Sequence, residues 1–205
     1  MTKRFWMLTL LASSAVLSIS VAAPVSADVV ATCAGCHGTE GTSSDKDLAI
    51  IGGMSAKYIS GTLDKYKSGD RKGCPEFTVT SGDKKGTKTD MCQVAKTLSD
   101  ADIAAAADHY AAKPFVRAQQ TVDAALADKG KAIHKESCEK CHTEGGSVKA
   151  DDAGMLAGQW MPYLAAQIAD FRSKKRMAAD KMQPKVEKLS QAEIDAVLQY
   201  YGSFK

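Results

Sequence analysis

The five-residue pattern Cys-x-x-Cys-His occurs twice in this chain, at Cys33–His37 and at Cys138–His142. It is the attachment pattern of c-type haem, in which two thiols add across the vinyl groups of the porphyrin and the histidine binds the iron. Two copies predict two covalently attached haem c groups. The residues assigned in this way are the thiols Cys33, Cys36, Cys138 and Cys141 and the iron ligands His37 and His142.

The spacing of the motif has a geometric reason. Two residues between the thiols, placed on the opening turn of a helix, bring both sulfurs to one edge of the ring, and the next residue turns its imidazole towards the iron. Zinc knuckles and thiol-redox motifs share the Cys-x-x-Cys spacing. Neither motif here has a further Cys or His pair at zinc-finger spacing, so haem attachment is the favoured interpretation.

Residues 1–27 have the pattern of a cleavable secretory signal peptide. Lys3 and Arg4 precede an apolar run that ends in small residues before Asp28. A charged start, a short apolar run and a small-residue cleavage site are typical of export signals. A retained anchor is the alternative, but serine and threonine residues interrupt the run, and no later stretch is apolar enough to span a bilayer. We therefore expect a periplasmic protein without a membrane span after cleavage.

The formal charge argues against a nucleic-acid partner. Cleavage of the signal peptide removes Lys3 and Arg4 and no acidic residue, so the net charge falls by two, from +3 to +1. Nucleic-acid-binding domains usually carry a strong basic excess. We expect no nucleic acid among the partners.

The second half of the mature chain repeats the first. A shift of 105 residues superimposes the two haem motifs, and a shift of 91 superimposes Ser99 on Ser190 and Tyr110 on Tyr201. The difference, 105 minus 91, is an insertion of 14 residues in the first repeat, between Gly69 and Met91. We predict two domains, at 28–117 and 118–205.

Both repeats have helical patterns, and strand signals are nearly absent, so the predicted fold class is all-α. Each final helix begins with a capping signature, Ser99-x-x-Asp102 or Ser190-x-x-Glu193. Each middle helix has an apolar face at helical spacing. The residues of these faces are Tyr58, Ile59, Leu63 and Tyr66 in the first repeat and Tyr163, Leu164, Ile168 and Phe171 in the second.

Methionine is the favoured sixth iron ligand. Only Met91 and Met182 correspond under the repeat, each seven residues before the Leu-Ser that precedes a final helix. A single methionine is often just a core gap-filler, but a matched pair indicates a shared role. The methionines without a counterpart are Met54, Met155, Met161 and Met177. His109 and His134 do not repeat either, and we interpret both as ordinary helix residues.

Two cysteines remain after the thioether bonds are assigned. Cys74 and Cys92 bracket the insertion, and an even pair in an exported protein usually forms a disulfide. The alternative is that Cys92 binds the first haem iron as a thiolate, which would lower its potential and suggest catalysis. The disulfide is the favoured interpretation.

In the second half, the segments that match a known family extend well beyond the haem motif. They are Ala124–Asp128, Cys138–His142, Glu144–Gly146, Leu156–Trp160, Pro162–Leu164, Asp170–Arg172 and Met182. With these segments the chain resembles the dihaem cytochrome subunit of flavocytochrome c sulfide dehydrogenase. More distantly, both halves are similar to the soluble dihaem cytochromes of the c-four class. In the first half Cys33–Gly38, Met91, Ala95-Lys96 and Ser99 carry the resemblance.

The resemblance implies two tandem class I cytochrome c domains with His/Met ligation and a pseudo-twofold arrangement. It also implies a partner, an FAD-containing flavoprotein that oxidises sulfide and passes electrons through the haems to an acceptor cytochrome or oxidase. The segment from Cys74 to Cys92 departs from the family pattern. Two alternatives stay open: a free dihaem carrier to a terminal oxidase, and a dihaem enzyme of the thiosulfate dehydrogenase type with a Cys-ligated haem.

Overall fold

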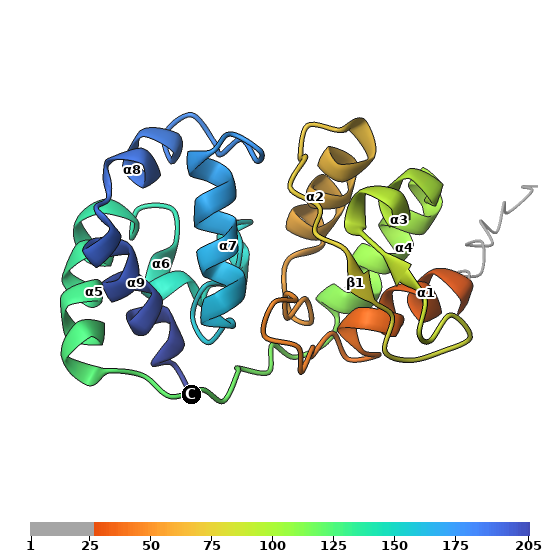
Figure 1. The fold of residues 1–205 in the computed structure, drawn as a ribbon, viewed down its shortest axis with the longest axis horizontal. Helices are drawn as coiled ribbons and strands as arrows, with labels where there is room; N and C mark the ends of the chain where they lie inside the picture. The colour runs from red at the N-terminus through yellow and green to blue at the C-terminus, as the bar shows by residue number, and fades with distance from the viewer. Residues whose placement is uncertain (1–26) are drawn as a thin grey trace, which may run out of the picture.

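The helices gather into two lobes, which are joined by one extended segment of chain (Figure 1). The computed structural model describes residues 27–205. Apart from Ala27, the predicted signal peptide lies outside the described residues. No helix within 27–205 has the length and apolar character needed to cross a membrane.

The first lobe contains four helices and a short β-hairpin. The helices are α1 (Ala27–His37), α2 (Ala56–Ser68), α3 (Met91–Thr97) and α4 (Asp100–Ala111). The strands β1 (Phe77–Thr78) and β2 (Lys88–Thr89) pair antiparallel, with Phe77 opposite Thr89. Strand signals are nearly absent from the sequence, so this hairpin was not predicted. It lies in the inserted segment, where a two-residue pair is too short to leave an alternating pattern.

The second lobe repeats this arrangement without the hairpin. Its elements are α5 (Ala124–Ser137), α6 (Thr143–Gly146), a 3-10 turn (Lys149–Asp151), α7 (Met161–Arg172), α8 (Gln183–Lys188) and α9 (Gln191–Gly202). Helices α5 and α9 pack closely at Gly130, where a Cβ atom would lie 2.0 Å from the carbonyl oxygen of Ala196. Only glycine permits this approach of the two backbones.

The predicted helix starts and apolar faces are confirmed. Capping boxes form at both predicted sites, Ser99 with Asp102 and Ser190 with Glu193. Each box satisfies backbone N–H groups that have no partner inside the helix. The middle helices α2 and α7 bury residues of their predicted faces, namely Ile59, Leu63 and Tyr66 in the first and Leu164 and Phe171 in the second.

Each lobe has its own apolar core, and Met155 reaches from the second repeat into the core of the first lobe. The first core is built around α2 and α4 and the second around α7 and α9. Met155 belongs by sequence to the second repeat, but it packs in the first core. Its counterpart under the shift of 105 is Ile50, which is 2% exposed. These two equivalent positions therefore lie at the contact between the lobes.

A buried glutamine joins the lobes through the backbone. The amide of Gln159 is fully buried; its Oε1 accepts from the N–H of Ile50 and its Nε2 donates to the carbonyl of Ile50, both at 2.9 Å. Two further bonds cross nearby, from Trp160 Nε1 to the carbonyl of Ser43 at 2.8 Å and from the Tyr163 N–H to the carbonyl of Lys46 at 3.1 Å. The loop before α2 is thus held by the loop before α7.

Replacement of Gln159 tests this contact. Gln159→Leu leaves the N–H and carbonyl of Ile50 buried without partners, so we expect the free energy of unfolding to fall by about 1–3 kcal/mol. Urea unfolding measures this free energy. Gln191→Leu, at an exposed glutamine on α9, is the control and should change little. Equal stability of the two variants would contradict the role given to Gln159.

Candidate haem sites

Both haem motifs lie at the end of a helix, and not on an opening turn as the sequence analysis expected. The first motif forms the last residues of α1, and Cys138 caps the C-terminus of α5. Helix α1 ends at His37 because Gly38 has φ 76°, in the left-handed region that favours glycine. In the second motif the Cys141 and His142 N–H groups both donate to the carbonyl of Cys138, at 3.1 and 3.0 Å. This turn keeps the two cysteines and the histidine together.

The imidazole of His37, a predicted iron ligand, is held in one orientation by the protein. It is buried, and its Nδ1 bonds to the carbonyl of Ala49 at 2.9 Å. This bond fixes the ring and leaves Nε2 for a metal. Burial lowers the pKa of His37, against the opposing effect of the Ala49 carbonyl. The ring is therefore held in the neutral form that binds iron.

The second histidine is placed in a corresponding way. The counterpart of Ala49 under the shift of 105 is Gly154. Burial lowers the pKa of His142, and the backbone of Gly154 partly opposes this effect. His142 Nδ1 is buried without a partner within hydrogen-bonding limits. The backbone at two equivalent positions, Ala49 and Gly154, therefore faces the candidate iron ligand of each lobe.

A cavity of about 1000 Å³ opens beside the first motif. Its wall holds the thiols of Cys33 and Cys36, the ring of His37 and the side chain of Met91. Apolar and aromatic side chains complete it, among them Leu48, Ile51, Met54, Ile59, Leu63, Val79, Leu98 and Tyr110. This volume and donor set fit a large, mostly apolar group held by two thioethers and an imidazole. The residues present thus fit haem c.

Two methionines line this cavity. Met91 is the first residue of α3, and Met54 is 3% exposed in the loop before α2. The repeat distinguishes Met91 from Met54, because the counterpart of Met54 is Gln159 and not a methionine. Gln159 is fully buried against Ile50 at the lobe contact. In the second lobe, Met182 lies at the start of α8, while Met177 is 53% exposed. Met91 and Met182 stay the proposed ligands.

The two rival histidines are engaged elsewhere. His109 Nε2 bonds to the carbonyl of Thr39 at 3.0 Å. His134 is 1% exposed, with Nδ1 bonded to the Tyr201 hydroxyl at 3.0 Å and Nε2 to Glu139 at 2.7 Å. Both nitrogens of His134 are therefore occupied. It lies within helix α5, as predicted, and its bond to Tyr201 ties α5 to α9, a role that the sequence does not reveal.

The inserted segment encloses the first motif. Thr80 N–H and Oγ1 donate to the carbonyl of Gly35 at 2.8 and 2.9 Å, and Ser81 Oγ donates to that of Ala34 at 3.2 Å. The buried side chain of Val79 lies so close that a Cβ on Gly35 would be 2.9 Å from its Cγ1. Gly35, the second of the two residues between the thiols, must therefore be small. Sequence analysis located the insertion but not its contact with the motif.

The predicted bridge across this segment is confirmed. Cys74 and Cys92 form a disulfide with their Cα atoms 5.9 Å apart. Because the sulfur of Cys92 is used in the bridge, it offers no thiolate to iron. The alternative of a Cys92-ligated haem is therefore not supported. The bridge also holds Cys92, the residue next to Met91, in place.

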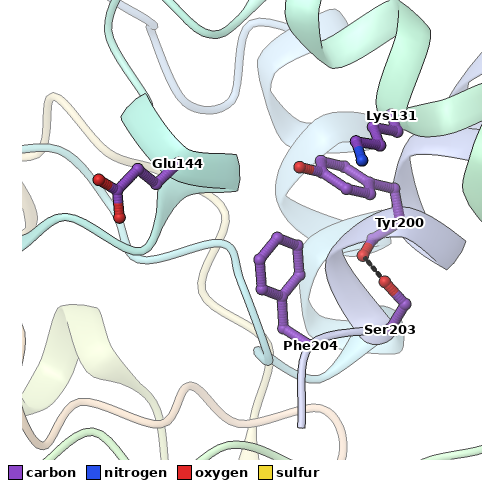
Figure 2. Close-up of a pocket in the computed structure, with 5 residues that line it drawn as sticks. All are labelled: Lys131, Glu144, Tyr200, Ser203 and Phe204. Carbon is purple, nitrogen blue, oxygen red and sulfur yellow. Dashed lines mark hydrogen bonds between the residues drawn. The ribbon is translucent and has the colours of Figure 1, made fainter.

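A second, smaller cavity of about 340 Å³ lies on the second lobe. Figure 2 shows its lining, formed by Lys131, Glu144, Tyr200, Ser203 and Phe204. Ser203 Oγ donates to the carbonyl of Tyr200 at 2.7 Å within this wall. No thiol or methionine lines it. Its lining therefore lacks the donor set of a haem c site.

Comparison with known proteins agrees with this geometry. A family model described as subunit III of the cbb3-type cytochrome c oxidase matches residues 125–200. Cytochrome c-554(548) of Halomonas halodenitrificans is 33% identical over 86 residues, which are 42% of this chain and 89% of that protein. The chain belongs to the c-type cytochromes.

Most of this cytochrome is similar to cytochrome c4. Cytochrome c4 of Azotobacter vinelandii is 28% identical over 184 residues, which are 83% of each chain. The structure of reduced cytochrome c4 from Pseudomonas stutzeri covers 90% of this chain and all of that one, with a TM-score of 0.69 and 25% identity. Thiosulfate dehydrogenase TsdBA of Marichromatium purpuratum has a TM-score of 0.64 at 26% identity, and 36% of that chain is covered.

The predicted fold class is confirmed by these likenesses. The cytochrome has the two-domain class I cytochrome c fold of cytochrome c4, and it is a c4-like dihaem electron carrier with covalent haem c. The boundary between 117 and 118 stays a prediction. The resemblance to the sulfide dehydrogenase subunit is supported only at the coarser level of c4-like dihaem cytochromes.

The methionine assignment has a matched test. Met91→Ala should abolish the thioether-to-iron absorption of one haem and lower its potential, because the soft thioether favours reduced iron. Met54→Ala, at the other methionine on the cavity wall, should keep that absorption. Optical spectra and redox titration read both effects. Loss of the band in Met54→Ala alone would show the assignment to be wrong.

Removal of the disulfide tests the inserted segment. Replacing Cys74 and Cys92 together by Ser opens a loop with a sequence separation of 18. The free energy of unfolding should fall by about 3 kcal/mol, the usual value for a loop of this length. Denaturant titration measures the loss, and alkylation of the unfolded wild type without reductant should find no free thiol. One labelled cysteine at position 74 would contradict the bridge.

Proposed function

We propose that His37 with Met91, and His142 with Met182, bind the two haem irons, and that the chain relays single electrons between protein partners. The observation that carries this proposal is the cavity wall on which two thiols, a neutral imidazole and a thioether meet. In the second lobe it is supported by the repeat, which places equivalent residues at each of these positions.

Bound haem supplies one-electron exchange between ferric and ferrous iron. The chain's own residues decide what else can happen there. Apolar side chains such as Leu63 and Leu98 limit water at the first site, and so disfavour the more charged ferric state. If His37 and Met91 both bind the iron, no coordination position would remain for a substrate. Relay, and not chemistry on a bound substrate, is the function that follows.

We propose a periplasmic location. The pattern in residues 1–27 supports export, and the disulfide between Cys74 and Cys92 supports an oxidising compartment. The sequence-based boundary before Asp28 defines the mature start. Analysis of the N-terminus of protein purified from its host would test this cleavage.

The electron donor proposed from the sequence is a sulfide-oxidising, FAD-containing flavoprotein. Its support is the match between Leu156 and Arg172, a region beyond the haem motif. Two haems in one chain would let two electrons leave a reduced flavin one at a time. A free carrier that feeds a terminal oxidase is the second candidate, and the full-length likeness to cytochrome c4 favours it.

Mixing experiments separate these candidates. The isolated chain should show only slow chemical reduction of its haems by sulfide. With the flavoprotein from the same host present, both haems should be reduced rapidly when sulfide is added, as followed by optical spectroscopy. No binding to that flavoprotein, together with rapid oxidation by a terminal oxidase, would establish the free carrier instead.

Thiosulfate provides the contrasting measurement. The chain is similar to a thiosulfate dehydrogenase, so direct oxidation of thiosulfate is the alternative to test. A Cys92 thiolate ligand would be needed for the enzyme considered in the sequence analysis, and the disulfide removes it. We therefore expect no rapid reduction by thiosulfate without a partner. Such a reduction would overturn the relay proposal.

A further inference from the structure

The residue that follows each proposed methionine ligand is attached to another part of its own lobe. Met91 and Met182 correspond under the shift of 91, and so do the residues that follow them, Cys92 and Gln183. A thiol and a primary amide have little chemistry in common. Both side chains nevertheless connect the start of a short helix to the segment that follows the middle helix of the lobe.

In the first lobe this attachment is covalent. Cys92, in the first turn of α3, forms its disulfide with Cys74, which lies in the segment after α2. The sulfur of Cys92 also lies 3.6 Å from the carbonyl oxygen of Arg71, in the same segment. Cys74 itself lines the cavity beside the first haem motif. The start of α3 is therefore fixed to the wall of that cavity.

In the second lobe hydrogen bonds make the corresponding attachment. Gln183 is the first residue of α8, and its Oε1 accepts from the N–H of Ala178, in the segment after α7, at 3.1 Å. Its Nε2 donates to the carbonyl of Phe171, in the last turn of α7, at 2.9 Å. The same Nε2 donates to Oε1 of Glu187 on α8, also at 2.9 Å. The start of α8 is therefore fixed to the end of α7.

The two short helices need such attachments. Helix α3 has seven residues and α8 has six. Isolated helices shorter than about 12 residues are marginal in water, because so few hydrogen bonds do not offset the cost of nucleation. The place of each methionine therefore depends on tertiary contacts of its neighbours, and the side chains at positions 92 and 183 make such contacts directly beside it.

The difference between the two attachments follows the length of the loops. The first repeat carries an insertion of 14 residues between Gly69 and Met91. A longer flexible segment costs more conformational entropy to close. A disulfide lowers that cost by restricting the unfolded chain, which the hydrogen bonds of one amide do not do. The longer loop thus has the covalent attachment.

We propose that Cys92 and Gln183 are positioning residues, which hold the thioethers of Met91 and Met182 in place for the two irons. This inference rests on the His/Met ligation proposed above. Each attachment lies within one lobe, so its loss should affect the haem of that lobe only. The histidine side should be unaffected, because His37 is held by the carbonyl of Ala49 in a different loop.

Titration of the oxidised, haem-loaded protein with imidazole tests the proposal. Imidazole is a good ligand for iron and competes with the thioether, so its affinity reports how firmly each methionine is held. In Gln183→Ala the affinity at one haem should rise on the order of tenfold, the effect of losing one or two hydrogen bonds. Replacing Cys74 and Cys92 together by Ala should raise the affinity at the other haem by at least as much. Met91→Ala shows which phase of the titration belongs to the first haem.

The two variants are controls for each other, since each should leave one haem unchanged. Unchanged imidazole affinity in both would overturn the proposal. An equal rise at both haems in either variant would also overturn it, because it would mean general loosening of the fold. A rise in only one variant would refute the role of the other residue. The wild type tests the ligand proposal separately: absence of its thioether-to-iron absorption would refute Met ligation before any variant is made.

Discussion

The hydrogen bond between His37 Nδ1 and the carbonyl of Ala49 is the contact on which the first site and the lobe interface both depend. It attaches the end of α1 to the loop that precedes α2. The next residue in that loop, Ile50, is held through its own N–H and carbonyl by Gln159 of the other lobe. The two neighbouring residues Ala49 and Ile50 therefore contact the proposed iron ligand His37 and the second lobe, respectively.

Sequence patterns predicted the features that depend on residues close together in the chain or on composition. The thiols and histidines follow from a five-residue motif, and the capping boxes at Ser99 and Ser190 follow from residues three apart. The disulfide followed from counting cysteines in an exported chain. In each case the information lies within a few residues or in the composition. The likeness to cytochrome c4 agrees with the fold class built from these rules.

Long-range polar contacts could not be predicted in this way. His134 was interpreted as an ordinary helix residue, and its partner Tyr201 is 67 positions away. The hairpin in the insertion bonds to Gly35, 45 positions before Thr80. Contacts between residues so far apart in the chain leave no periodic signal in a single sequence. The error about the motif, which ends helices and does not begin them, has another cause: helix ends are set by single residues such as Gly38, whose φ of 76° is visible only in the structure.

The repeat separates two kinds of position. Residues that match, such as His37 and His142, have the same proposed role in both lobes, while mismatched ones such as Met54 and Gln159 serve one lobe or the contact between lobes. Arg71 and Arg176 match and still lie at the contact. The backbones of Arg71 and Arg176 form an antiparallel bridge, so this residue meets its own counterpart between the lobes, as in a symmetric dimer. Such a position must suit both lobes with one residue type. Here each guanidinium lies over an aromatic ring of its own lobe, and both donate to Oε1 of Gln167.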